Sequence, residues 1–210
     1  MKLFAFVILL VFTAPAATAK PHLFLSKSFP GSTPAYVSID IDPDGSAVYR
    51  EAVNDEYALK FTLDPEDAAE LFRLADKLDR FSRNLESGLK VANMGMKTFR
   101  WEDGTTRNEA KFNYSLDEDA RLLGDWFEKI SETEQRFVLL ERTVKYDKLG
   151  VNQSLLLFES GWDRKRIVAP EQFLGLLDRV AKNESYLHMA RERAARLADT
   201  IRARKSPKAE

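Results

Sequence analysis

The residues with the clearest chemical spacing are a run of acids, Asp40-Ile41-Asp42-Pro43-Asp44-Gly45, followed by Glu51. The run matches the pattern of a calcium-binding loop, in which carboxylates at positions one, three, five and twelve surround one ion. The candidate metal ligands are therefore Asp40, Asp42, Asp44 and Glu51. Calcium is the only cofactor that the sequence suggests.

The surrounding sequence favours a simpler interpretation of this run. A calcium loop of this type lies between two helices, whereas the alternating segment 35–41, with β-branched Val37 and Ile39, predicts a strand. Pro43 fixes a backbone angle inside the loop. A tight turn also needs Asp and Gly, for side-chain bonding to the backbone and for positive φ. We therefore expect a hairpin turn, with calcium binding as the alternative.

Few other residues point to catalysis. The chain has two histidines, His22 and His188, and no cysteine, so it lacks the close ligand sets of zinc sites. Ser160-Gly161 does not fit the frame of a nucleophile elbow, and no glycine-rich phosphate loop occurs. A pair of carboxylates remains a possible catalytic device because acids are abundant, but the sequence singles out no pair.

The predicted elements follow the order βββαββα and are then all helical. Three strands precede a helix that begins near Asp64-Pro65. A second hairpin, with strands from Val91 to Trp101 and from Arg107 to Tyr114, surrounds Asp103-Gly104. Ser115 with Glu118 forms a capping box for the next helix. This order predicts an α+β fold, an antiparallel sheet layered with helices, and an all-helical C-terminal half. The expected organisation is an extended segment at 20–34, an α+β domain at 35–134, a helical region at 135–204 and a basic tail at 205–210.

Residues 1–19 have the layout of a secretory signal peptide. Lys2 precedes an unbroken apolar run, and Ala17-Thr18-Ala19 gives the small-x-small pattern that predicts cleavage between Ala19 and Lys20. The apolar run is too short to cross a bilayer, and no other segment is apolar enough. We therefore expect an exported, soluble protein, periplasmic or extracellular, with neither disulfides nor a cysteine-linked lipid.

Charge excludes one further class of function. Without the single lysine of residues 1–19, 31 basic residues face 33 acidic ones, a net charge of −2. Dedicated nucleic-acid binders need a marked excess of basic side chains to contact phosphates. We therefore expect no nucleic-acid partner.

Pro34-Ala35-Tyr36 leading into Ile39, followed by Asp44-Gly45 and Tyr49, resembles the opening of small exported bacterial domains of unknown function. The resemblance covers about residues 29–115. Thr33 occupies the place where those domains commonly have a cysteine. The resemblance implies export and an α+β domain, and it brings no activity or site.

These observations favour a non-catalytic binding or interaction module of the cell envelope, with a protein partner there. The alternatives are a carboxylate-dependent envelope hydrolase, which needs two acids in one concave site, and a calcium-stabilised structural protein. The sequence leaves the oligomeric state open.

Overall fold

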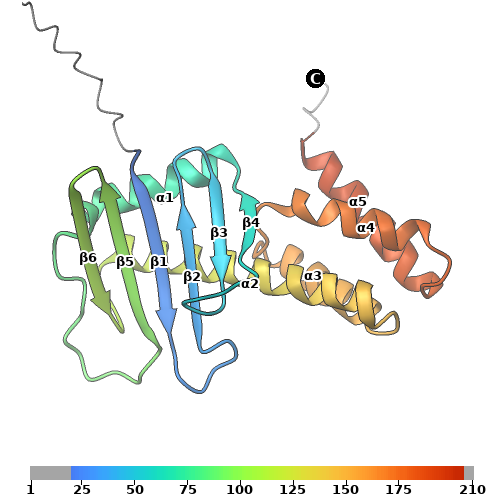
Figure 1. Ribbon diagram of the computed structural model, residues 1–210, viewed down its shortest axis with the longest axis horizontal. Helices are drawn as coiled ribbons and strands as arrows, with labels where there is room; N and C mark the ends of the chain where they lie inside the picture. The colour runs from blue at the N-terminus through green and yellow to red at the C-terminus, as the bar shows by residue number, and fades with distance from the viewer. Residues whose placement is uncertain (1–19, 206–210) are drawn as a thin grey trace, which may run out of the picture.

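Six antiparallel strands form one sheet in the computed structural model, which describes residues 20–205 (Figure 1). Their order across the sheet is β4-β3-β2-β1-β5-β6. The strands are β1 (His22–Ser28), β2 (Tyr36–Ile41), β3 (Ser46–Arg50), β4 (Leu59–Thr62), β5 (Met96–Asp103) and β6 (Thr106–Phe112). The predicted α+β class is confirmed.

The strand β1 departs from the expected element order. It lies in segment 20–34, which we expected to lead into the sheet, and it pairs with both β2 and β5 at the sheet centre. Four strands, not three, therefore precede the first helix. The strand is hard to recognise in the sequence because polar and apolar residues do not alternate in it. The apolar Phe24 faces away from the helices, between Leu23 and Leu25, which are buried.

The hairpin between β2 and β3 is a tight turn. The amide of Gly45 donates to the carbonyl of Asp42 at 2.9 Å, and that of Asp42 to Ser46 at 2.9 Å. Gly45 has a φ of +85°, and a Cβ there would lie 2.6 Å from the carbonyl oxygen of Leu63. Both the conformation and the close approach require glycine.

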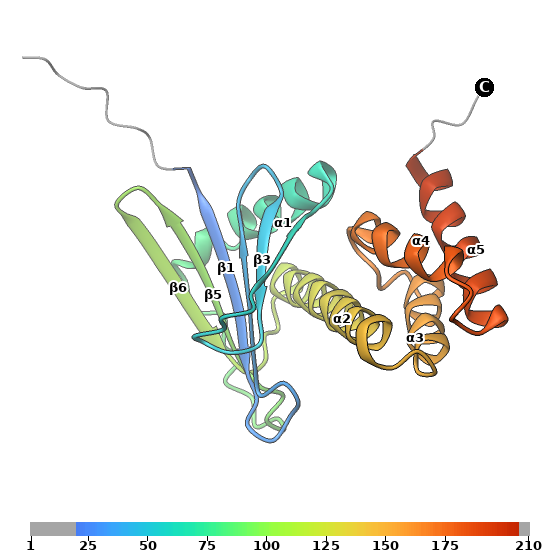
Figure 2. The same cartoon turned by 45° about the vertical axis from the view of Figure 1, so that its right-hand side comes forward.

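Two helices cover one face of the sheet: α1 (Pro65–Lys77) and the first half of α2 (Glu118–Tyr146) (Figures 1 and 2). Inward-facing strand residues and the helix stripes form one apolar cluster, which includes Leu25, Ile39 and Phe99. Such burial drives the layered arrangement because each CH₂ removed from water contributes about 0.8 kcal/mol.

The second half of α2 belongs to another core. It packs with α3 (Val151–Asp163), η2 (Pro170–Phe173), α4 (Leu174–Lys182) and α5 (His188–Lys205) around Phe158 and Phe173. The predicted helical C-terminal half is confirmed. The helix α2 runs without interruption through residue 134, where we placed the boundary between the two parts.

Two local predictions were wrong. The side chain of Asp117, not of Ser115, caps α2 by accepting from the amide of Ala120 at 3.1 Å. The second hairpin begins at Met96 instead of Val91. Residues 85–95 form a loop because Asn113 holds them outside the sheet, accepting from the amide of Met94 at 2.7 Å and donating to the carbonyl of Ala92 at 3.0 Å.

Within residues 20–205, none of the helices combines the length and the apolar character needed to cross a membrane. The signal peptide predicted at 1–19, with the cleavage expected after Ala19, lies outside the described residues, as do residues 206–210 of the predicted basic tail.

Candidate functional site

The face of the sheet opposite the helices carries no covering element among the described residues (Figure 2). Directly paired residues of an antiparallel sheet share a face, so the register defines its side chains. One row crosses all six strands of this uncovered face: Lys60, Val48, Asp40, Phe24, Arg100 and Glu109. We call this surface the open face.

Near one end of the open face, His22 lies between two of the predicted metal ligands. Its Nε2 is 2.9 Å from Oδ1 of Asp40, and its Nδ1 is 2.9 Å from Oδ1 of Asp42. The hydrogen bond to Asp40, reinforced by Asp42, raises the pKa of His22 to about 9 against the opposing effect of burial. The imidazole is therefore protonated at neutral pH and donates a hydrogen bond to each carboxylate.

The predicted calcium ligands do not come together. Asp40 also pairs with Arg50, and its contacts with His22 and Arg50 hold its pKa below the usual range despite partial burial. Asp44 stays in the turn, accepting from the amide of Ser46 at 3.0 Å. Glu51 accepts from the hydroxyl of Tyr49 at 2.9 Å, and Tyr49 belongs to the core on the helix side of the sheet.

Within residues 20–205, no three His, Asp or Glu side chains are arranged to hold a metal ion. The structure unites Asp40 and Asp42 but leaves the four-carboxylate set divided between the two sides of the sheet. Calcium binding at these residues stays a prediction.

A shallow depression of about 430 Å³ surrounds the His22 cluster. Its floor and walls include Asp40, Asp42, Lys60 and Thr62. Two acids do share this concave surface, as a carboxylate-dependent hydrolase requires. The imidazolium of His22 donates to Oδ1 of both carboxylates, so each of them is held in an ion pair.

The centre of the open face combines an aromatic ring with arginine. The guanidinium of Arg100 lies 4.4 Å from the ring centroid of Phe24, a cation–π contact. Arg100 also donates to Glu109 at 2.9 Å, which fixes the guanidinium across the strands. The pair presents a half-buried apolar surface held in one geometry.

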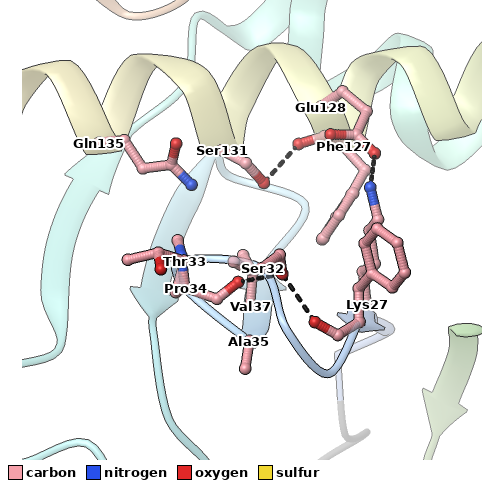
Figure 3. Close-up of a pocket in the computed structure, with 11 residues that line it drawn as sticks. Lys27, Ser32, Thr33, Pro34, Ala35, Val37, Phe127, Glu128, Ser131 and Gln135 are labelled. Carbon is pink, nitrogen blue, oxygen red and sulfur yellow. Dashed lines mark hydrogen bonds and ion pairs between the residues drawn. The ribbon is translucent and has the colours of Figure 1, made fainter. Parts of the chain in front are cut away.

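A smaller cavity of about 160 Å³ lies on the other side of the sheet, between the β1–β2 loop and α2 (Figure 3). Lys27 and Glu128 face each other there, 2.8 Å apart. The hydroxyl of Ser131 donates to the carbonyl of Phe127 at 2.8 Å. Because these lining groups already bond to one another, the cavity offers a ligand few free polar contacts.

One acid is buried at the junction of the two cores. Glu134 on α2 is fully inaccessible, and its Oε1 accepts from Nε2 of Gln172 at 2.9 Å. Its Oε2 has no hydrogen-bond partner among the described residues, and burial raises its pKa to about 7. A pKa of this kind suits a general acid, but the carboxyl is out of reach of any substrate.

No protein-family model matches the chain, and no curated protein matches it. The resemblance to exported bacterial domains stays a prediction.

Sequence reasoning missed the roles of Phe24, Arg100 and Glu134. The strand β1 had to be recognised before Phe24 could be placed beside Arg100, which lies far from it in the sequence. Glu134 shows a weak signal: it falls on the apolar stripe of its helix, four residues after Ile130.

Proposed function

We propose that this protein is an exported, non-catalytic binding module of the cell envelope and that its open face contacts a protein partner. The observation that supports this most directly is the uncovered sheet face with Phe24 and Arg100 at its centre. Export rests on the signal-like residues 1–19.

The residue types at the centre of the open face are those that contribute most to protein–protein binding. Aromatic and arginine side chains are enriched among the few residues that dominate interface energies, and they are usually surrounded by polar contacts. Phe24 and Arg100 are surrounded in this way by the polar side chains of Asp40, Arg50 and Glu109. The arrangement therefore resembles the centre and rim of a binding surface.

The ion pairs on this face also favour binding over catalysis. His22 is bonded to Asp40 and Asp42, and Arg100 to Glu109, so these side chains are ordered before a partner arrives. Immobilising such a side chain on binding otherwise costs about 0.5–1.5 kcal/mol. Paired charges of mixed sign also suit a protein surface better than a polyanion.

The proposal is tested by affinity capture from envelope extracts of cells that produce the protein. The immobilised wild-type chain should retain a discrete partner, and Phe24→Ala should lose it, because this substitution removes the apolar centre while leaving the helix-facing core intact. Tyr57→Ala is the matched control, since Tyr57 is 86 % exposed in the loop between β3 and β4.

Equal retention by Phe24→Ala and the wild-type chain would contradict the proposal, as would a partner lost only with Tyr57→Ala. Circular dichroism of both variants shows that the fold is kept. Arg100→Gln provides a second substitution of the same centre if Phe24→Ala proves unstable.

A further inference from the structure

A second cavity lies on the helix-facing side of the sheet, away from the open face. It has a volume of about 200 Å³ and is bounded by β1, β5, the end of β6 and the first turns of α2. The side chains that matter for its chemistry are Lys27, Lys97, Arg121, Met94 and Phe112. It combines positive charge with apolar walls.

Lys97 is an unusual residue for this side of a strand. It alternates with the buried Phe99 and Trp101, so its ammonium points toward the helix layer. Its Nζ donates to the carbonyl of Asn113 at 3.2 Å. Among the described residues, no carboxylate lies within ion-pair distance of it. A half-buried ammonium without an anionic partner is unfavourable.

The other charges around the cavity do not neutralise Lys97. Lys27 forms an ion pair with Glu128, with Nζ 2.8 Å from Oε1. Arg121 has no ion-pair partner among the described residues. Glu86 lies near Lys97 but accepts from the amide of Asn113 at 2.6 Å. Burial, and then the neighbouring Lys27, lower the pKa of Lys97. Lys27, Lys97 and the exposed Arg121 therefore face two acids, Glu128 and Glu86, both already bonded, and an anion would relieve the remaining imbalance.

The apolar wall contains space that the fold does not use. Gly124 is in the interior of α2, and a Cβ built on it would meet no atom within 4 Å. Glycine in a helix interior destabilises relative to alanine, and packing does not require it here. The space beside Gly124 adjoins Phe112 and Met94 in the cavity wall. A ligand in the cavity would fill it.

The rim of the cavity is held in place. Asn113 bonds to the amide of Met94 at 2.7 Å and to the carbonyl of Ala92 at 3.0 Å, and the amide of Ser87 donates to Tyr114 at 2.9 Å. These contacts tie the loop 85–95 to the end of β6. The cavity is therefore formed without a ligand, as most small-molecule sites are.

We propose that this cavity binds a small monocarboxylic acid with a short apolar body, its carboxylate meeting Lys97 and Arg121 and its chain lying beside Gly124 and Phe112. A cavity of about 150 Å³ holds a benzene ring, so 200 Å³ suits a chain of about six carbons. The site is separate from the open face, so either proposal stands if the other fails.

Titration of the ¹⁵N-labelled protein with hexanoate, followed by amide NMR shifts, tests the proposal. Hexanoate should shift amides around the cavity and bind at least about tenfold more tightly than 1-hexanol, the difference expected for one charge-assisted hydrogen bond. Lys97→Met should lower the hexanoate affinity by about the same factor. Lys60→Met on the open face is the matched control and should leave it unchanged.

Gly124→Leu should fill the space and abolish binding of both hexanoate and 1-hexanol. If this variant does not fold, the comparison of Lys97→Met with Lys60→Met still tests the proposal. The proposal is overturned if about 10 mM hexanoate causes no shifts, far above the concentration that a specific small ligand needs. It is also overturned if 1-hexanol or inorganic phosphate matches hexanoate, or if Lys97→Met binds hexanoate as the wild type does.

Discussion

At the scale of single residues, Glu134 is the one charged side chain that the described chain buries completely. The groups that face it from other elements are Gln172 of η2, which bonds to it, and Tyr49 of β3. Neither is a cation, so burial dominates and raises the pKa of Glu134 to about 7. The folded protein therefore keeps the carboxyl of Glu134 protonated below about pH 7.

This burial makes stability depend on pH. The unfolded chain releases the Glu134 proton near pH 4.5, whereas the folded chain keeps it until about pH 7. The protein therefore has its full free energy of unfolding below the pKa of Glu134 in the unfolded chain. This free energy falls as the pH rises between the two pKa values and stays lowered above both. We predict that Glu134→Gln, which is neutral at every pH, gains on the order of 3 kcal/mol over the wild type between pH 4 and pH 8.

Urea unfolding of both proteins at pH 4 and pH 8 measures this difference, because the titrations of other groups cancel between them. A difference in unfolding free energy that does not change with pH would show that Glu134 is not buried in its protonated form.

At the scale of elements, the glycines of two helices should respond in opposite ways to alanine. Gly124 of α2 has open space where a methyl group would lie, whereas a Cβ on Gly161 of α3 would be 2.9 Å from Cδ1 of Ile167 and 3.0 Å from Nε of Arg136. We predict that Gly124→Ala stabilises the protein by about 1 kcal/mol.

Gly161→Ala should destabilise it, because the crowding exceeds the gain in helix propensity. Thermal or urea unfolding of the two variants beside the wild type checks both signs. Stabilisation by both substitutions would mean that α3 is packed less closely than the contacts of Gly161 indicate.

Sequence patterns predicted most elements because their signals are local. Asp42 to Gly45 form the turn that their types require, and the helix after Pro65 begins where expected. The strand β1 was missed because its partners, β2 and β5, are defined only by the sheet. The cap at Asp117 was missed because Ser115 and Glu118 offer an equally good local pattern.

At the scale of the whole molecule, two cores share one helix of 29 residues, α2. Contacts around its middle join the halves: Thr133 accepts from the amide of Val168 at 3.1 Å, and Glu134 bonds to Gln172. Farther away, Arg204 of α5 pairs with Asp64 at the start of α1. The helical half is therefore attached beside the sheet and leaves the open face uncovered (Figure 2).

The candidate sites could be predicted only in part. The acids Asp40 and Asp42 were identifiable as residues, but their partner His22 is 18 positions away from Asp40 in sequence and belongs to the strand that was missed. The cavity beside Lys97 combines four elements, and a lysine between apolar residues gives no sign of its surroundings. Sites built from distant strands need the register, which sequence alone does not supply.

Photo-cross-linking in the producing cells tests most directly whether the open face meets a protein. A benzophenone side chain at Val48, which lies beside Asp40 on that face, should give one discrete cross-linked product. The same group at Asp199 of α5, a position with an 80 % exposed side chain, is the matched control and should give none. No product from Val48, or the same products from both positions, would contradict a protein-binding role for the open face.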